Sequence, residues 1–312
     1  VSAHTSDVNT QIGTITVPVV TTNYQNFEFT IKVYISERIP LNASGVTVSA
    51  SEITYGQTLN ESKLTATGTM KHPGTGEEVK GTFAWTNPET KPGAAGDYTA
   101  SWTFTPAEGY EEYAPATGNV TVKVNKADPT FTAPAAKTLT YTGSEQTLLT
   151  AGSTQDGTMM YRLGESGEFV DSIPNGKDAG TYTVCYKVVG DGNHNDTEVQ
   201  FVSVTIKPME LLRFVSTPSV TKTYDGTAVA PLSEDAVTFN SRNASKLSLP
   251  KGAYSITNAR FTMKQTDGSY ADSPEVGNGK SLSFTVTLTS DNYVFESTTE
   301  DSKTIVCDIA TD

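Results

Sequence analysis

ITYGQTL at residues 53–59 returns as LTYTGSEQTLL at 139–149 and as KTYDGTAVAP at 222–231. A second motif follows the first two copies, as AGDYTASWTF at 95–104 and AGTYTVCYKV at 179–188. The third copy has GNGKSLSFTVTL at 277–288 in the equivalent place, after a longer insert. Each copy closes with an alternating segment, which begins at Asn119, Val202 and Lys303 in turn. The same motifs in the same order indicate tandem modules.

These repeats predict module 1 at 41–127, module 2 at 128–207 and module 3 at 208–312. Short junctions marked by Asp128-Pro129 and Lys207-Pro208 separate them, and segments this short favour semi-rigid neighbours. Residues 1–40 resemble the back half of a preceding repeat, because 13–35 matches the end of module 3. In both, a strand runs into an Asn-Tyr turn, at Asn23-Tyr24 and Asn292-Tyr293. A half-module of this kind must pair with something or fray.

Alternation of apolar and polar residues predicts strands throughout. Tyr98, Ala100, Trp102 and Phe104 share one face of their segment, while the threonines and serine between them share the other. Further apolar rows are Tyr182, Val184, Tyr186 and Val188; Val120, Val122 and Val124; and Phe27, Phe29, Ile31, Val33 and Ile35. The fold class expected is all-β, with tandem immunoglobulin-like β-sandwich modules in an elongated array spanning on the order of 110 Å. A β-grasp module, which mixes a helix into the sheet, is the alternative.

Composition limits the function classes. The net charge is −13 and the sequence pI about 4.7, which argues against nucleic acid, since binding phosphates requires clustered Lys and Arg. No run approaches the roughly 18 apolar residues of a membrane span. No secretion signal opens the chain, which is therefore expected to be a processed protein or a piece of a longer one.

The TYxG turn, the AGxYT strand and the Asn-Tyr turn together resemble the immunoglobulin-like repeats of bacterial surface proteins. Tyr55-Gly56 and, less closely, Tyr141-Thr142-Gly143 are similar to the YGX type, and Tyr224-Asp225-Gly226 to the YDG type. The resemblance implies monomeric extracellular or cell-surface modules without cofactor, anchored to the cell wall through other regions. It implies a role as stalk or as adhesive module, with host glycan, mucin or matrix protein as partner. The alternative is an accessory carbohydrate-binding or spacer region of a large secreted carbohydrate-active enzyme.

No catalytic motif accompanies the repeats. The histidines, His4, His72 and His194, share no metalloprotease spacing and are expected in exposed loops. Gly164-Glu165-Ser166-Gly167 lacks the spacing of a nucleophile elbow. The sequence therefore predicts no enzyme activity.

One loop and two cysteines carry weaker signals. DGNHND at 191–196 places Asp191, Asn193, Asn195 and Asp196 where a calcium ion could use their oxygens, although a tight turn needs the same residue types. Strand parity places Cys185 outward with Thr183 and Lys187. The same parity buries Cys307 with Ile305 and Ile309, so a disulfide between the two is not expected.

The repeated tyrosines Tyr55, Tyr141 and Tyr224 are expected to pack within their modules, as a tyrosine corner does. Tyr110 and Tyr113 in an acidic loop, with Tyr34 on the polar side of its strand, are the candidates for stacking on a sugar or peptide ligand. The longer insert of module 3 is either a contact site or the mark of a different module subtype.

Overall fold

The computed structural model describes residues 11–34, 37–216, 219–277, 280–296 and 301–310, and these are almost entirely strand, turn and coil. Within these ranges the helices are two single 3-10 turns, η1 (Leu59–Glu61) and η2 (Glu234–Ala236). None of the helices found there could cross a membrane. The predicted all-β class is confirmed, and the helix of a β-grasp module does not occur in the described residues.

The amino-terminal segment is an antiparallel hairpin of β1 (Gln11–Val19) and β2 (Phe27–Tyr34). The apolar row predicted along β2 is present, and no other sheet of the described part of the chain covers it. Phe27 and Phe29 are each 56% exposed and Ile31 is 43% exposed. Ile35 and His4 lie outside the described residues.

Module 1 is built on a four-stranded sheet in the order β4-β10-β9-β8, with two further strand pairs, β3-β5 and β6-β7. The short β4 runs parallel to β10, the closing strand of the module, and the other neighbours in the sheet are antiparallel. Its strands are β3 (Thr47–Ala50), β4 (Ile53–Thr54), β5 (Leu64–Thr67), β6 (Met70–Lys71), β7 (Glu78–Val79), β8 (Gly81–Trp85), β9 (Gly96–Pro106) and β10 (Ala116–Asn125).

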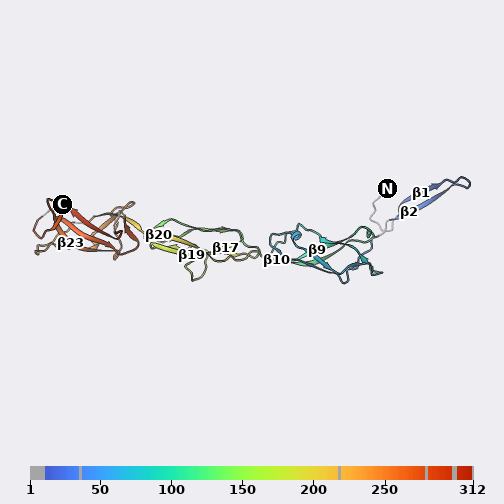
Figure 1. Ribbon diagram of the computed structural model, residues 1–312, viewed down its shortest axis with the longest axis horizontal. Coiled ribbons are helices and arrows are strands. Elements are labelled where there is room, and N and C mark those ends of the chain that lie inside the picture. The colour runs from blue at the N-terminus through green and yellow to red at the C-terminus, as the bar shows by residue number, and fades with distance from the viewer. Residues whose placement is uncertain (1–10, 35–36, 217–218, 278–279, 297–300, 311–312) are drawn as a thin grey trace. The chain divides into compact units, whose positions relative to one another are not determined.

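Module 2 repeats this plan with a sheet in the order β13-β20-β19-β17 and the pairs β11-β16, β12-β15 and β14-β18. Again the short strand that carries the TYxG motif runs parallel to the closing strand. Its strands are β11 (Phe131–Thr132), β12 (Ala135–Ala136), β13 (Leu139–Thr140), β14 (Gln146–Thr147), β15 (Leu149–Thr150), β16 (Ser153–Thr154), β17 (Gly157–Leu163), β18 (Asn175–Gly176), β19 (Gly180–Gly190) and β20 (Gln200–Lys207). Figure 1 shows β17, β19 and β20 running side by side.

Module 3 has two sheets, β24-β23-β25-β27 and β22-β21-β26. The insert noted in the sequence forms much of β23 and the hairpin to β24, so it supplies strands of the main sheet. The strands are β21 (Met209–Ser216), β22 (Thr238–Ser241), β23 (Tyr254–Lys264), β24 (Tyr270–Asp272), β25 (Ser281–Leu288), β26 (Tyr293–Phe295) and β27 (Thr304–Ala310).

The chain divides into two compact units by contact density. Unit 1 contains 1–128 together with 191–195, and unit 2 contains 129–190 and 196–312. Modules 2 and 3 share unit 2 because one continuous cluster of buried residues runs through both of them. The core of module 1 is two smaller clusters, centred on Val122 and on Phe104.

Burial follows the predicted alternation closely in β9 and β19. Ala100, Trp102 and Phe104 are buried in β9, and Val184, Tyr186 and Val188 are buried in β19. Cys185 departs from it, since the prediction that it faces outward is wrong. The chain after β17 folds back over that face, and the Cys185 Sγ donates to the carbonyl oxygen of Gly164 at 2.9 Å. Cys307 is buried as predicted, and both thiols are free.

The close approach of β9 and β10 depends on one glycine. Gly118 lies opposite Trp102, and a Cβ built on it would lie 2.3 Å from the indole Cζ2. We therefore expect Gly118→Ala to lower the free energy of unfolding of module 1 by about 1–3 kcal/mol, because the buried ring must shift. Chemical denaturation followed by tryptophan fluorescence measures the change. Gly93→Ala is the control, since its Cβ meets nothing within 4 Å, and an equal loss there would contradict the packing argument.

Candidate functional site

Each module carries a turn after its long central strand, at 107–115, 191–199 and 289–293, the last of which ends on the first residue of β26 (Tyr293–Phe295). We call these the junction turns. The chain that leads into each module pairs in parallel with an aromatic residue of that module's own junction turn. The three pairs are Ile39↔Tyr113, Ala127↔His194 and Met209↔Tyr293.

The hydrogen bonds of the three pairs are equivalent. In each, the backbone N–H of the leading chain donates to the carbonyl oxygen of the residue before the aromatic. The distances are 2.7 Å from Ile39 to Glu112, 3.0 Å from Ala127 to Asn193, and 2.9 Å from Met209 to Asn292. The same register at three places shows that the junction turn is a fixed part of the repeat.

In the second and third junction turns the residue before the aromatic is asparagine, and its side chain binds the AGxYT motif of the module before it. Asn193 Oδ1 accepts a hydrogen bond from the Ala95 N–H at 2.9 Å. Asn292 Oδ1 accepts one from the Ala179 N–H at 2.6 Å. Asn292 also donates through Nδ2 to Asp178 Oδ1 at 2.9 Å. A side-chain amide can accept and donate at once, which suits this position.

The aromatic residue then contacts the tyrosine of the TYxG motif. Tyr55 and His194 meet edge to face, with ring centroids 5.4 Å apart and an interplanar angle of 85°. Tyr141 and Tyr293 meet in the same way, at 5.3 Å and 83°. Edge-to-face pairs are a favoured aromatic geometry. The prediction that these tyrosines pack only within their own modules is therefore incomplete for Tyr55 and Tyr141, because each covers a junction turn.

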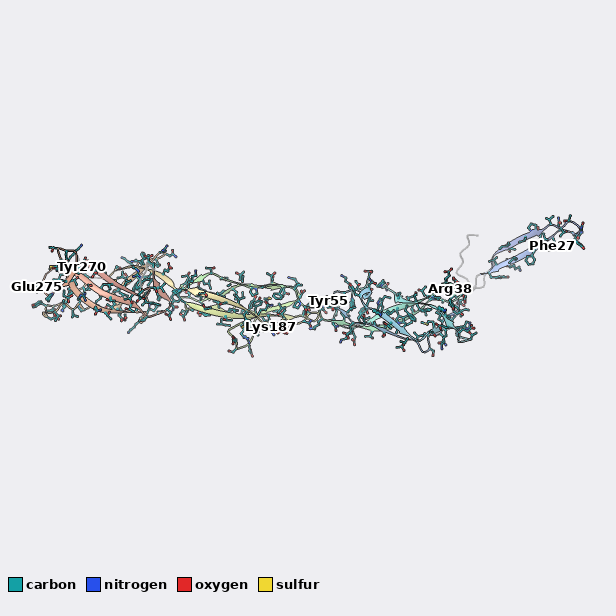
Figure 2. All side chains as sticks on the ribbon, viewed as in Figure 1. Phe27, Arg38, Tyr55, Lys187, Tyr270 and Glu275 are labelled. Carbon is teal, nitrogen blue, oxygen red and sulfur yellow. The ribbon has the colours of Figure 1, made fainter. Side chains whose placement is uncertain are left out.

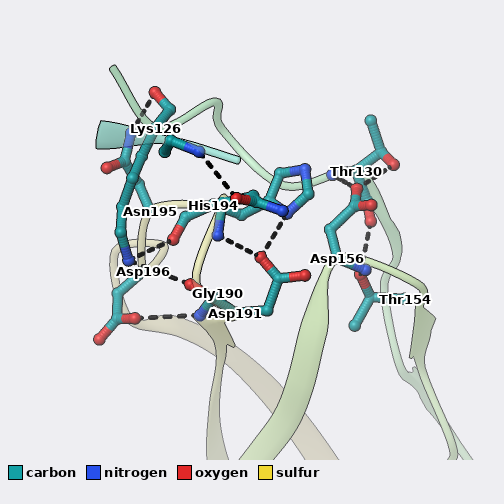
Figure 3. A network of polar contacts seen from close by, with 11 residues as sticks. Lys126, Thr130, Thr154, Asp156, Gly190, Asp191, His194, Asn195 and Asp196 are labelled. Carbon is teal, nitrogen blue, oxygen red and sulfur yellow. Dashed lines mark hydrogen bonds and ion pairs between the residues drawn. The ribbon is translucent and has the colours of Figure 1, made fainter. Parts of the chain in front are cut away.

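Residues 191–195 of the second junction turn belong to unit 1, and their oxygens are engaged there. The Lys126 ammonium donates to the carbonyl oxygens of Asp191 and His194, at 3.0 and 3.1 Å. Asp191 Oδ1 accepts a hydrogen bond from the Asn193 N–H and pairs with His194 Nδ1 at 2.8 Å. The hydrogen bond from Asn193 and the pairing with His194 lower the pKa of Asp191. Figure 3 shows this loop with Lys126 beside it.

The remaining two calcium candidates also have protein partners. Asn195 Nδ2 donates to Asp128 Oδ1 at 3.0 Å, and Asp196 Oδ1 accepts from the Gly190 N–H at 3.0 Å. Across the described residues, no three His, Cys, Asp or Glu side chains gather as metal ligands. Contacts to the protein thus account for the oxygen-rich sequence of this loop, in which an ammonium takes the carbonyl oxygens.

The predicted ligand-binding tyrosines are separated by the fold. Tyr113 is 7% exposed, and its ring meets His72 at 6.0 Å and Tyr110 at 6.2 Å, so the interpretation of Tyr113 as a free stacking surface is wrong. The acidic loop folds this ring into the core of module 1, where Tyr110 partly covers it. Tyr34 is 54% exposed on the hairpin. The expectation of exposed loop histidines is wrong for His194, whose side chain is 12% exposed.

Sequence reasoning missed the junction turn as a site. The signal was present, because Asn23-Tyr24, Asn193-His194 and Asn292-Tyr293 are all asparagine followed by an aromatic residue.

The burial of Tyr293 against Tyr141 predicts that the protein loses stability at high pH. Burial, with a smaller contribution from the Tyr141 hydroxyl, raises the pKa of Tyr293 to about 12 from an ordinary 10. Burial likewise raises the pKa of Cys307 to about 12. The unfolded chain loses these protons first as the pH rises, so the unfolding free energy falls between about pH 9 and 12 and is unaffected below that window.

Denaturation of the wild type and Tyr293→Phe at a series of pH values measures this slope. The variant has no phenol to ionise at position 293, so we expect its stability to fall less steeply above pH 10. Tyr34→Phe is the control, because its ring is exposed. An unchanged slope in Tyr293→Phe would contradict the assignment.

Comparison with known proteins gives no family. No family profile matches the sequence, and no curated protein matches it. Among solved structures, the protocadherin gammaB7 EC3-6 cis-dimer structure is similar at 11% identity over 92% of this chain and 80% of that one, with a TM-score of 0.33. Drosophila N-cadherin EC1-4 has 8% identity over 95% and 81%, with a TM-score of 0.26. The human desmocollin-1 ectodomain has 10% identity over 92% and 60%, with a TM-score of 0.21.

Two of these structures are named as a protocadherin and a cadherin and the third as an ectodomain, and scores this low carry no partner or activity over to this chain. What the strands themselves establish is an all-β chain of tandem sandwich modules.

Proposed function

We propose that the chain is a non-catalytic structural region of a bacterial secreted or cell-surface protein, in which tandem modules serve as a stalk. The observation that carries the proposal is the repeated junction contact. An asparagine and an aromatic residue of one module bind the AGxYT alanine and the TYxG tyrosine of the module before it, with nearly the same geometry twice.

This arrangement suits a spacer because the junction turns are used to bind the neighbouring module. In immunoglobulin-like sandwiches, loops at the ends of the sheets are the usual place for ligand contacts. Here the second and third junction turns are occupied by their neighbours. A repeated contact between adjacent units is also how solenoid and array proteins gain stability from nearest-neighbour terms.

The alternative role is an adhesive module, and Tyr34 and Tyr110 are the residues proposed to contact a glycan, mucin or matrix protein. A binding screen of the full chain against immobilised mucins, a glycan array and matrix proteins separates the two roles. For a stalk we expect no saturable binding. Saturable binding that disappears in Tyr34→Ala or Tyr110→Ala, with Tyr270→Ala as the control for an exposed tyrosine elsewhere, would replace the stalk proposal with an adhesive one.

A further inference from the structure

The second and third junction turns have the same internal shape, although their sequences differ. In each, the residue two positions before the asparagine accepts a hydrogen bond from the asparagine N–H through its own side chain. Asp191 Oδ1 lies 2.8 Å from the Asn193 nitrogen, and Ser290 Oγ lies 3.2 Å from the Asn292 nitrogen. Side-chain turns of this kind fix the course of the backbone around them. The carbonyl groups of the two turns are therefore comparable position by position.

In both turns a lysine ammonium binds the carbonyl oxygens of the aromatic residue and of the residue three positions before it. In the second turn this lysine is Lys126, whose contacts can be followed in Figure 3. In the third turn Lys303 Nζ donates to the carbonyl oxygens of Ser290 and Tyr293, at 2.8 and 3.0 Å. It also donates to Asp291 Oδ1 at 3.3 Å, so each of its three N–H groups has an acceptor.

The two lysines reach this position from different parts of the chain. Lys126 lies in the leading chain, one residue before the bridge between that chain and the turn. In module 3 the same position is held by Pro208, which carries no charge. Lys303 instead immediately precedes the closing strand β27. Two unrelated positions bring the same group to the same oxygens, which indicates that the turn requires a positive charge there.

The first junction turn is built differently. The carbonyl oxygen of Tyr110, three positions before the aromatic residue, accepts a hydrogen bond from the Tyr113 N–H at 3.1 Å. Glu112 stands in place of the asparagine. Figure 2 shows Arg38 at the end of module 1 where its leading chain enters, and Tyr55 at the opposite end, where the second junction turn contacts it. The docking asparagine and the bound ammonium are thus found together, in the second and third turns.

We propose that the second and third junction turns are ammonium-binding sites, and that Lys126 and Lys303 are the positioning residues that hold each turn in the form that docks on the preceding module. Hydrogen bonds from a charged donor are about twice as strong as neutral ones, so the ammonium fixes both carbonyl groups. The asparagine lies between these two groups along the chain. Fixing them therefore directs its Oδ1 toward the alanine N–H of the AGxYT motif.

The carbonyl oxygens, more than the carboxylate, define the site in the third turn. The Asp291 side chain is 95% exposed, and an ion pair with so exposed a carboxylate contributes little. The Lys303 side chain is 31% exposed. A small ammonium ion from solution can therefore reach the same oxygens once the lysine side chain has been removed. The proposal rests on the junction contact of the proposed function and adds the group that controls it.

Hydrogen exchange of the full chain carrying Lys303→Met tests the proposal, because methionine keeps much of the stem and removes the charge. The Ala179 amide, which donates to the Asn292 side chain, should exchange about 10-fold faster. The Phe284 amide lies in the central strand β25 and should stay protected, which shows that module 3 remains folded.

The second turn provides an independent copy of the experiment. Lys126→Met should accelerate exchange of the Ala95 amide by a similar factor and leave the Ala179 amide unchanged. Lys123→Met is its control, because the Lys123 ammonium pairs with the exposed Glu52 on the neighbouring strand end and does not reach the turn. It should leave the Ala95 amide as it is in the wild type.

Lys222→Met is the matched control in module 3. The Lys222 ammonium also binds two carbonyl oxygens, those of Thr227 and Val229 at 3.1 and 2.8 Å, but it does so in the turn of the third TYxG motif. This lysine closes the turn without its tyrosine. Tyr224 is 65% exposed, so the prediction that it packs as the other two tyrosines do is wrong. Loss of this ammonium should leave the Ala179 amide unchanged.

Chemical rescue gives a result that general destabilisation would not give. Lys303→Ala opens the site, and methylammonium at about 0.1 M should restore slow exchange of the Ala179 amide, because it supplies an ammonium with N–H donors. Tetramethylammonium at the same concentration has no N–H donor and should restore nothing. Equal recovery with both ions, or recovery with neither, would overturn the proposal.

Failure of this proposal can be told apart from failure of the proposed function. If Asn292→Ala accelerates exchange of the Ala179 amide and Lys303→Met does not, the junction contact stands and the ammonium is not what holds the turn. That result overturns the present proposal alone. If neither variant accelerates it, the contact on which both proposals rest does not protect this amide, and both are overturned.

Discussion

Replacement of Tyr293 by alanine is expected to lower the free energy of unfolding of unit 2 by about 3–5 kcal/mol. Tyr293 is 6% exposed, and its ring packs between the core of module 3 and Tyr141 of module 2. Removing a buried ring costs both its transfer free energy and the cavity left behind. Guanidinium denaturation at pH 7, followed by circular dichroism, measures the loss. Tyr293→Phe keeps the ring and should cost no more than about 1 kcal/mol.

A double-mutant cycle separates the contact with Tyr141 from the burial within module 3. We expect Tyr141→Ala and Tyr293→Ala to be non-additive by about 0.5–1.5 kcal/mol, which is typical of an edge-to-face pair. The cycle needs a single cooperative transition, which the shared buried cluster of modules 2 and 3 favours. Strict additivity would mean that the two rings do not stabilise each other.

Replacement of Asn292 by alanine is the second large effect, with an expected loss of about 1–3 kcal/mol. The change leaves the half-buried Ala179 N–H without its acceptor at 2.6 Å and removes the hydrogen bond to Asp178. Hydrogen exchange gives a local readout, since the Ala179 amide should exchange at least ~10-fold faster in the variant. The Met209 amide bonds to the Asn292 carbonyl oxygen, which alanine retains, and should stay protected.

Asn193→Ala is the matched control for this experiment, because it makes the same change one junction earlier. It should expose the Ala95 amide to exchange and leave the Ala179 amide unchanged. If both variants changed both amides, or neither, the side-chain amides would not be the local contacts that the structure shows.

Repeats and period-two alternation were enough to predict the strands and the all-β class. Trp102 and Phe104 in β9, and Val184 and Val188 in β19, are buried as their parity requires. The matched Asn-Tyr turns at 23–24 and 292–293 were visible as well, and so was the similarity in sequence between the closing strands of the copies. These features are local, because a strand with one buried face needs an apolar residue at every second position.

Other positions depend on which segment covers them. Cys185 lies on the face that parity makes polar, yet it is fully buried because the chain after β17 folds over it. Tyr113 belongs to an acidic loop that looks exposed, yet its ring enters the core of module 1 beside His72. Alternation reports the two faces of a strand and carries no information about a distant segment that crosses one of them.

The sequence alone determined the strands, their repeat and the all-β class, because each follows from short-range periodicity and turn chemistry. Only the tertiary structure decided that Tyr141 is covered while Tyr224, in the same motif, is open. The motif is local, but its environment depends on whether an asparagine and an aromatic residue from another module are brought against it. That contact spans more than a hundred residues between Ala179 and Asn292. No spacing rule within one strand encodes it, since it joins residues of two different modules.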